Sequence, residues 1–123
     1  MLLHDFFDAV AAFDEDAFAK LMHPEARISE MPNAMNRSGT ERDMTTALAA
    51  FRKGKTMLAE QSYEVHDVLE AGDKIAARAT WRGRLNDGPE LAAEIATFTE
   101  VRDGRIYRHA TYDCYELRAF KVG

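Results

Sequence analysis

Residues 101–113 read VRDGRIYRHATYD and contain an Asp-Gly pair between two runs typical of strands. Asp-Gly at such a position favours a type I′ turn, so we expect a tight β-hairpin here. Counting outward from this turn sets Phe98 opposite His109. The same register sets Glu94 opposite Asp113. The sequence therefore predicts two long antiparallel strands that carry ionisable side chains.

One face of this hairpin is predicted to form the wall of a pocket. Successive side chains of a strand point to opposite faces, so every second residue of each strand shares a face with its neighbours across the hairpin. The predicted set is Glu94, Ala96, Phe98, Tyr107, His109, Thr111, Asp113 and Tyr115. Ionisable groups on such a face suit a small-molecule pocket, but they do not define a reaction.

The remainder of the chain is predicted to contain three helices and three further strands. Apolar residues at helical spacing predict a helix over 2–13, and Asp14 is expected to cap a second helix that ends at the His-Pro pair 23–24. A short strand over 26–31 follows, and Thr40 is expected to cap a third helix that ends near Gly54. From residue 57 onward, three turn signals divide the chain into four strands of about twelve residues.

This order of elements predicts an α+β fold. A meander of four antiparallel strands has one face to bury, and the three N-terminal helices are available to cover it. Strands much longer than the usual five or six residues should twist and bend around those helices. We therefore expect a cone with an interior cavity, formed by a single domain over residues 1–123.

Composition argues against several classes of function. The net charge of the 123 residues is −5, and 16 basic residues are scattered among 21 acidic ones, which disfavours nucleic acid and membrane surfaces as partners. No apolar run approaches the roughly 20 residues that span a bilayer. One cysteine cannot form an internal disulfide, and the acidic N-terminus does not resemble a signal peptide, so we expect a cytoplasmic protein.

The order of elements and several local strings resemble the SnoaL-like branch of the nuclear transport factor 2-like (NTF2-like) superfamily. Residues 14–26 resemble the second helix of that family and its exit, residues 70–83 its second hairpin, and residues 103–113 its final hairpin. The resemblance covers nearly the whole chain. It implies a cone-shaped NTF2-like fold, small and mostly apolar ligands, and homodimers that form through the outer face of the sheet.

The resemblance does not transfer the catalytic residues of the ketosteroid isomerases. Those enzymes would place a tyrosine on the first helix and a carboxylate immediately before the proline of the first strand. This sequence has Phe6, Phe7 and Met31 near those places, and Glu30 is one residue away.

Two other chemistries of the superfamily also lack their residues. An epoxide hydrolase would carry an Arg-x-Asp pair where this chain has Ala79 and Trp81. The aspartate of cyclases and hydrolases on the last strand would fall at Thr111. By contrast, His109 lies where relatives place a His or Trp that faces the cavity. Fold alone does not assign one activity, because one fold serves many.

His109 and Asp113 are the candidate catalytic residues. A histidine with a near-neutral pKa suits proton transfer on a ketone-like substrate, as in isomerisation, cyclisation or dehydration. If Glu94 lies opposite Asp113, repulsion between the carboxylates should raise the pKa of one of them. Alternatively, both carboxylates lie at the hydrated rim of the sheet, and His109 is a structural histidine.

The ligand is expected to be a small apolar molecule. The residues expected to contact it are Phe7, Val10, Met31, Trp81, Glu94, Phe98, Tyr107 and Thr111. Ordinary core packing would explain the apolar members equally well. No spacing among the four histidines resembles a metal site, and no cofactor is expected. The alternative function is a non-catalytic module that senses a ligand or associates with a protein.

Overall fold

A strongly curved sheet of six strands forms the frame of the protein. A computed structural model of the chain describes residues 2–116, and its strands run in the order β2-β1-β6-β5-β4-β3. The strands are β1 (Met22–Glu30), β2 (Thr40–Arg42), β3 (Leu58–Ala71), β4 (Lys74–Leu85), β5 (Glu90–Arg102) and β6 (Arg105–Tyr115). The last four form the predicted antiparallel meander. The sheet as a whole is mixed, because β1 pairs in parallel with β6.

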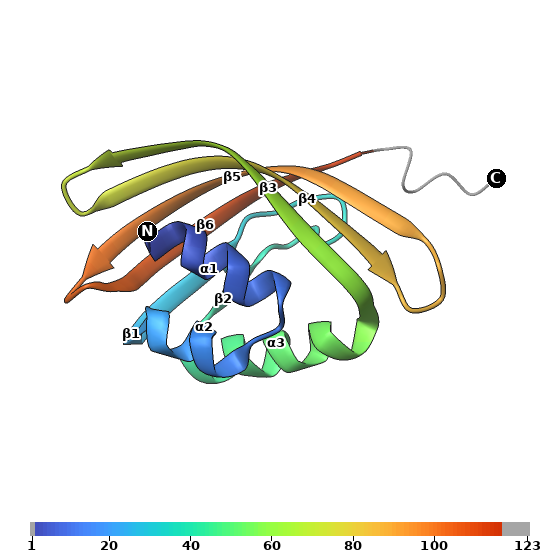
Figure 1. The fold of residues 1–123 in the computed structure, drawn as a ribbon, viewed down its shortest axis with the longest axis horizontal. Helices are drawn as coiled ribbons and strands as arrows, with labels where there is room; N and C mark the ends of the chain where they lie inside the picture. The colour runs from blue at the N-terminus through green and yellow to red at the C-terminus, as the bar shows by residue number, and fades with distance from the viewer. Residues whose placement is uncertain (1, 117–123) are drawn as a thin grey trace.

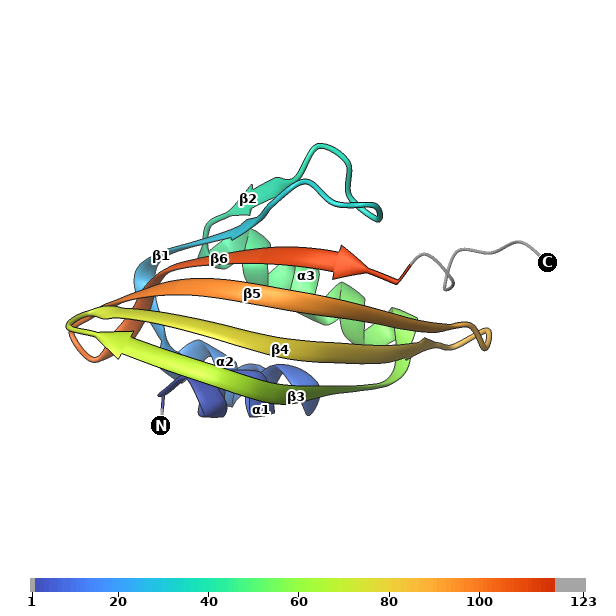
Figure 2. The same cartoon turned by 90° about the horizontal axis from the view of Figure 1, so that it is seen from above.

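Three helices lie under the concave face of this sheet (Figure 1). They are α1 (Leu2–Ala11), α2 (Glu15–Leu21) and α3 (Met44–Met57). Figure 2 shows the sheet from above, with β2 and β1 at one edge and β3 at the other. The predicted α+β cone, a bent sheet wrapped around N-terminal helices, is confirmed. No helix within residues 2–116 has the length and apolar character needed to cross a membrane.

The starts of α2 and α3 are set by aspartate caps. Asp14 accepts a hydrogen bond from the backbone N–H of Ala17 at 3.1 Å, as the sequence predicted. Asp43 makes the same contact with the N–H of Thr46 at 2.9 Å. The prediction that Thr40 caps α3 was wrong, because residues 40–42 pair with β1 and form β2.

The His-Pro pair 23–24 lies inside β1 and does not end a helix. Helix α2 ends at Leu21, and its C-cap Met22 already has extended backbone angles. Pro24 is tolerated in the strand because the pairing of β1 with β6 is interrupted between Met22 and Arg27. A proline has no N–H to donate, so it is confined to such irregular positions of a sheet.

The turn between β5 and β6 has the predicted chemistry but a different register. Asp103 and Gly104 both have positive φ, 54° and 73°, as a type I′ turn requires. A β-bulge follows, because Val101 pairs with Ile106 while Glu100 pairs with Arg108. The residue between Ile106 and Arg108 is therefore extra, and it shifts every later pair by one position.

The hydrophobic core lies between α1, α2 and the sheet. Leu3, Phe6 and Phe7 of α1 are buried, and they pack with Phe18 of α2 and with Ile106 of β6. Full burial of such side chains contributes roughly 1.5–3 kcal/mol each. This packing fixes α1 against the sheet, so α1 forms one wall of the space between the helices and the concave face.

Candidate functional site

A cavity of about 270 Å³ lies between α1 and the concave face of the sheet. Its walls are mainly aromatic and aliphatic. The aromatic members are Phe6, Phe7, Tyr63, Trp81 and Tyr115, and the aliphatic members are Val10, Ile28, Ala93 and Ile95. Its volume is close to the lower limit of roughly 300 Å³ for typical ligand pockets, so it suits a small molecule.

Its polar members come from four strands. They are Glu30 of β1, Gln61 of β3, Thr97 of β5, and His109, Thr111 and Asp113 of β6. A few converging polar groups within an apolar cavity are typical of sites that orient a ligand. The chemistry of the site depends on the environment of each group.

His109 is a neutral imidazole at the depth of the cavity. Its side chain is 5% exposed, and its ring lies 4.6 Å from the ring of Phe6, centroid to centroid. Nδ1 lies 2.8 Å from the hydroxyl of Thr99. Burial lowers the pKa of His109 to about 4, so the ring is uncharged at neutral pH. Nε2 makes no hydrogen bond within residues 2–116.

Asp113 occupies a partly buried position on the same strand. Burial raises the pKa of its carboxyl group, and the negative charge of Glu30 raises it further. The hydroxyl of Thr111 donates a hydrogen bond to Oδ1 at 2.5 Å, which acts in the opposite direction. Asp113 is therefore a carboxyl group that accepts a proton more readily than one in water.

Two tyrosines beside Asp113 hold their protons firmly. Burial raises the pKa of Tyr115 to about 12, and the charges of Asp113 and Glu30 add to this effect. Burial, followed by the charge of Asp113, also raises the pKa of Tyr63. Both phenols are neutral at physiological pH and can donate hydrogen bonds.

A chain of hydrogen bonds from Trp81 to α1 holds another part of the cavity wall. The indole N–H of Trp81 donates to Gln61 Oε1 at 2.9 Å, and Gln61 Nε2 donates to the carbonyl oxygen of Val10 at 2.7 Å. Gly83 leaves the space that the indole occupies, because a Cβ atom there would lie 2.4 Å from Trp81 Cζ2. The ring of Trp81 is thus fixed in position against the cavity.

Thr97 contributes a hydroxyl that is buried without a hydrogen-bond partner in the described part of the chain. Its side chain is 1% exposed, and it lines the cavity. Buried polar groups are usually paired, since an unpaired group costs about 1–3 kcal/mol. The hydroxyl of Thr97 is therefore a buried polar group beside the cavity, unpaired within residues 2–116.

The structure brings six of the predicted site residues to the cavity. Both candidate catalytic residues are among them, together with four expected to contact the ligand. The six are Phe7, Val10, Trp81, His109, Thr111 and Asp113. Their grouping agrees with the predicted orientation of β6 toward the helices, whereas their roles stay predictions.

Glu94 and Phe98 lie on the opposite, convex face of the sheet, so their predicted place in the cavity was wrong. Asp113 pairs with Ile95, and Glu94 accepts a hydrogen bond from Thr80 at 2.8 Å. Phe98 is 57% exposed. The bulge after the turn explains both errors, because a shift of one residue exchanges the faces of a strand.

Tyr107 and Met31 also lie outside the cavity lining. Tyr107 is the extra residue of the bulge, and its ring lies 3.7 Å from the guanidinium carbon of Arg102 and 3.8 Å from that of Arg108. Met31 follows the end of β1, where its N–H donates to the carbonyl oxygen of Thr111 at 3.0 Å. Neither side chain lines the space around His109.

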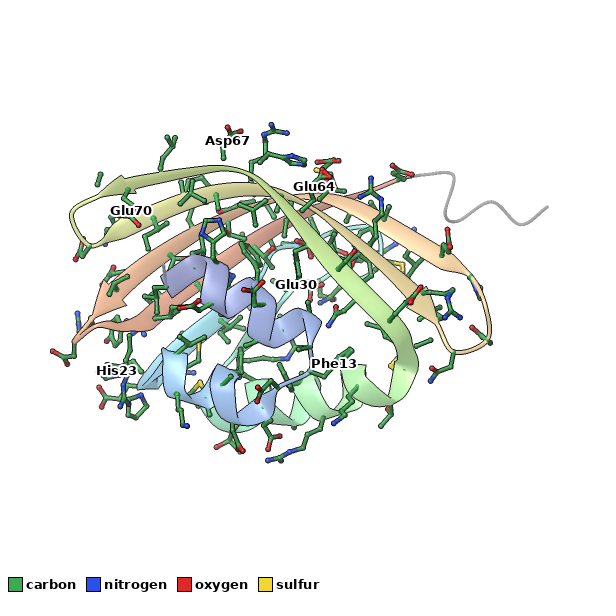
Figure 3. All side chains as sticks on the ribbon, in the orientation of Figure 1. Phe13, His23, Glu30, Glu64, Asp67 and Glu70 are labelled. Atoms are coloured by element: carbon green, nitrogen blue, oxygen red, sulfur yellow. The ribbon has the colours of Figure 1, made fainter. Side chains whose placement is uncertain are left out.

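Several cavity residues were missed by the sequence analysis. The carboxylate that influences Asp113 is Glu30, which lies beneath the sheet in Figure 3, whereas Asp67 projects from the convex side. Thr97, Gln61 and Tyr63 were missed too. Gln61 and Tyr63 are two residues apart on β3, so the sequence could have indicated that they share a face. The bulge between β5 and β6 prevented the same inference for Thr97, because it changes which β5 residues share a face with His109.

Residues 2–116 contain no group of three or more His, Cys, Asp or Glu side chains that could hold a metal ion.

Comparison with known proteins places the chain among NTF2-like folds. IdmH from Streptomyces antibioticus, a candidate polyketide cyclase, is 24% identical with a TM-score of 0.75, covering 91% of this chain and 88% of IdmH. TsrD from Streptomyces laurentii is 25% identical with a TM-score of 0.72, covering 96% of this chain and 87% of TsrD. An LEH-like epoxide hydrolase from M. tuberculosis is 16% identical with a TM-score of 0.73, covering 96% and 82% of the two chains.

No curated protein sequence is significantly similar to this one. The family of the SnoaL-like domain matches residues 3–109, which is most of the chain. This match agrees with the cone-shaped fold and with the structural neighbours described above. The chain therefore belongs to the SnoaL-like family.

Proposed function

We propose that this protein binds a small, mostly apolar metabolite in the cavity and moves a proton on it by acid–base catalysis. The observation that carries the proposal is the position of Asp113 and His109 along one cavity, where burial raises the pKa of the carboxyl and lowers that of the imidazole. Titratable groups with shifted pKa values that line one cavity are typical of functional sites.

Asp113 is assigned the role of general base. Its carboxylate takes a proton from a carbon next to a carbonyl, and the electron pair of that C–H bond becomes the enolate of the ligand. A raised pKa favours this transfer, because the ideal base has a pKa near the working pH. For a β,γ-unsaturated ketone, return of the proton from Asp113 to the γ-carbon of the conjugated enolate gives isomerisation. For a ligand with a second carbonyl, attack by the enolate carbon on that carbonyl forms the ring, and the resulting alkoxide takes the proton from Asp113.

His109 is assigned the role of hydrogen-bond donor to the developing enolate oxygen. When Nδ1 accepts the hydroxyl proton of Thr99, the ring proton resides on Nε2, which has no partner within residues 2–116. A neutral imidazole can donate this proton to an oxygen in the cavity. The unpaired hydroxyl of Thr97 is a second donor of the same kind.

The structural similarity to IdmH, a candidate polyketide cyclase, is consistent with this class of reaction. By contrast, an epoxide hydrolase mechanism has no charged pair to use here. Ala79 and Trp81 stand on β4 where the charged residues would be, and Ala79 is fully buried.

The proposal is tested by measuring how fast the α-hydrogens of a ketone exchange with deuterium from deuterated water in the presence of the protein. Purified protein is incubated with a panel of small cyclic ketones, and NMR follows loss of the α-proton signals. We expect exchange with the wild type and at least about a hundredfold slower exchange with Asp113→Asn, since a general base contributes about 10²–10⁴-fold.

Glu94→Gln is the matched control, because Glu94 is a carboxylate of the neighbouring strand on the convex face. It should exchange protons at the wild-type rate. Equal exchange by the wild type and Asp113→Asn would remove Asp113 from the mechanism.

Native mass spectrometry of the purified protein adds a direct search for a copurified ligand.

A second candidate function is association through the convex face of the sheet. Leu69, Phe98 and Tyr112 are exposed there, and the ring centroids of Phe98 and Tyr112 lie 5.7 Å apart. A groove beside them is lined by Leu69, Ala76 and Phe98 among others. Exposed apolar patches mark interaction sites, and twofold homodimers are the commonest assemblies. We propose that a second copy of this chain covers this face.

A further inference from the structure

The charges along the cavity are unbalanced. Glu30 and Asp113 both line it, and within residues 2–116 no Lys or Arg does so. Carboxylates removed from water are normally paired with a cation or neutralised. Here burial raises the pKa of Asp113, and the negative charge of Glu30 raises it further. The cavity therefore favours a positive charge that the described side chains do not supply.

Each carboxylate has one oxygen engaged and one available. Glu30 Oε2 accepts a hydrogen bond from Asn33 Nδ2 at 2.9 Å, and Asp113 Oδ1 accepts one from Thr111. Glu30 Oε1 and Asp113 Oδ2 make no hydrogen bond or ion pair with residues 2–116. These contacts hold both side chains in place and leave an acceptor on each.

Aromatic rings form the rest of the surroundings. Phe7 and Tyr63 pack with centroids 4.8 Å apart, and Trp81 meets Tyr115 edge to face at 6.2 Å. The two pairs come from α1, β3, β4 and β6, so rings border the cavity from both the helix and the sheet. The faces of such rings carry partial negative charge and attract cations, most strongly where water is excluded.

Thr97 independently indicates that this space receives a ligand. Its hydroxyl is buried, lines the same cavity and has no hydrogen-bond partner within the described residues. A bound molecule with a hydroxyl, carbonyl or N–H group would satisfy it. The observation does not depend on the carboxylates.

We propose that the ligand of this cavity carries a compact organic cation, a protonated or quaternary amine, held between the carboxylates of Glu30 and Asp113 and enclosed by aromatic rings. This inference rests on the proposed function, because it names the chemical class of the molecule bound there. The volume of about 270 Å³ restricts the ligand to a small molecule. Binding of the cation would also favour the ionised form of Asp113, which is the form that acts as a base.

The test compares a cation with a neutral molecule of the same shape. Choline and 3,3-dimethylbutan-1-ol differ only in the charged nitrogen, and both are titrated against the full chain. The chain has one tryptophan, Trp81, and it lines the cavity, so its fluorescence reports binding there. Ligand-observed NMR extends the measurement to weak complexes. We expect choline to bind at least about tenfold more tightly than the neutral alcohol.

Variants identify the source of this preference. Glu30→Gln keeps the shape of the side chain, and it should weaken choline binding by about tenfold while binding of the alcohol is unchanged. Combined with Asp113→Asn it should abolish the preference. Glu25→Gln is the control, because Glu25 is an exposed residue of the same strand that does not line the cavity. Circular dichroism establishes that each variant is folded.

The outcomes separate this inference from the proposed function. Equal binding of the two molecules, or a preference that survives in the double variant, would overturn the cationic ligand and leave a binding cavity for neutral molecules. Binding of neither molecule, at concentrations up to the millimolar range, would overturn the cationic ligand and count against the cavity as a binding site.

Discussion

The hydroxyl oxygen of Thr99 lies 2.8 Å from Nδ1 of His109, and both side chains are almost fully buried. The contact joins β5 to β6 beneath Phe6 of α1. It fixes the orientation of the imidazole and provides a hydrogen-bond partner for Nδ1. Thr97 and Thr99 lie two residues apart on β5, so variants of the two residues can measure how much this hydrogen bond contributes to stability.

Thr99→Val should lower the free energy of unfolding by about 1–3 kcal/mol, because it leaves Nδ1 of His109 buried without a partner. Thr97→Val is the matched comparison, since Thr97 is equally buried on the same face but its hydroxyl is unpaired within residues 2–116. That change should leave stability unchanged or increase it. Urea denaturation of both variants measures the difference, and equal losses of stability would contradict the assigned hydrogen bond.

Stability should decrease in mildly acidic solution because of His109. Its pKa is about 4 in the folded protein against 6.5 for an ordinary histidine, so the unfolded chain binds the proton more tightly. This contribution to stability is complete above pH 6.5 and is lost as the pH falls toward 4, by roughly 3 kcal/mol in total.

The comparison of wild type with His109→Gln isolates this effect from the titration of carboxyl groups. Urea denaturation at several pH values between 7.5 and 4.5 should show a smaller dependence on pH for the variant. Parallel curves for the two proteins would mean that His109 titrates normally in the folded state.

Gly83→Ala should destabilise the protein by about 1–3 kcal/mol through overpacking. The added Cβ would overlap the indole of Trp81, which is held by its hydrogen bond to Gln61. Gly54→Ala is the control, since a Cβ there meets only Phe13 at 3.7 Å and alanine favours the helix. Thermal unfolding and Trp81 fluorescence measure both effects. An unchanged spectrum in Gly83→Ala would contradict the packing described.

Phe98→Lys should convert the proposed homodimer to a monomer without unfolding it. Phe98 is 57% exposed in the single chain, so the change disrupts a contact between copies and little else. Sedimentation velocity of wild type and variant gives the result. Met35→Lys is the control, because Met35 is an exposed residue of the loop between β1 and β2. A monomeric wild type at high concentration would remove the dimer from the account.

Strong local signals in the sequence predicted most of the fold. Three turn sequences delimited four strands in which apolar and polar residues alternate. Asp14 marked the start of α2. The boundary of α3 could not be predicted in the same way. Thr40 and Asp43 are both good capping residues, and only the pairing of residues 40–42 with β1 decides between them.

Only part of the site could be predicted from the sequence, because one inserted residue changes the pairing register of two strands. His109, Thr111 and Asp113 alternate on one strand, so their common face could be read directly. Which residues of β5 share that face depends on the bulge at Tyr107, which inserts one residue after an ordinary type I′ turn. The turn sequence contains no signal for that insertion, so Phe98 and Glu94 were assigned to the wrong face.

The most direct test of the account is a pH titration of His109 and Asp113 by NMR in the wild-type protein. The central claim is that β6 turns both side chains into a space with little water. Imidazole signals of His109 should titrate near pH 4, and the carboxyl carbon of Asp113 should titrate above the ordinary value of 3.8. Ordinary pKa values for both groups would mean that they face bulk water, and would contradict the account.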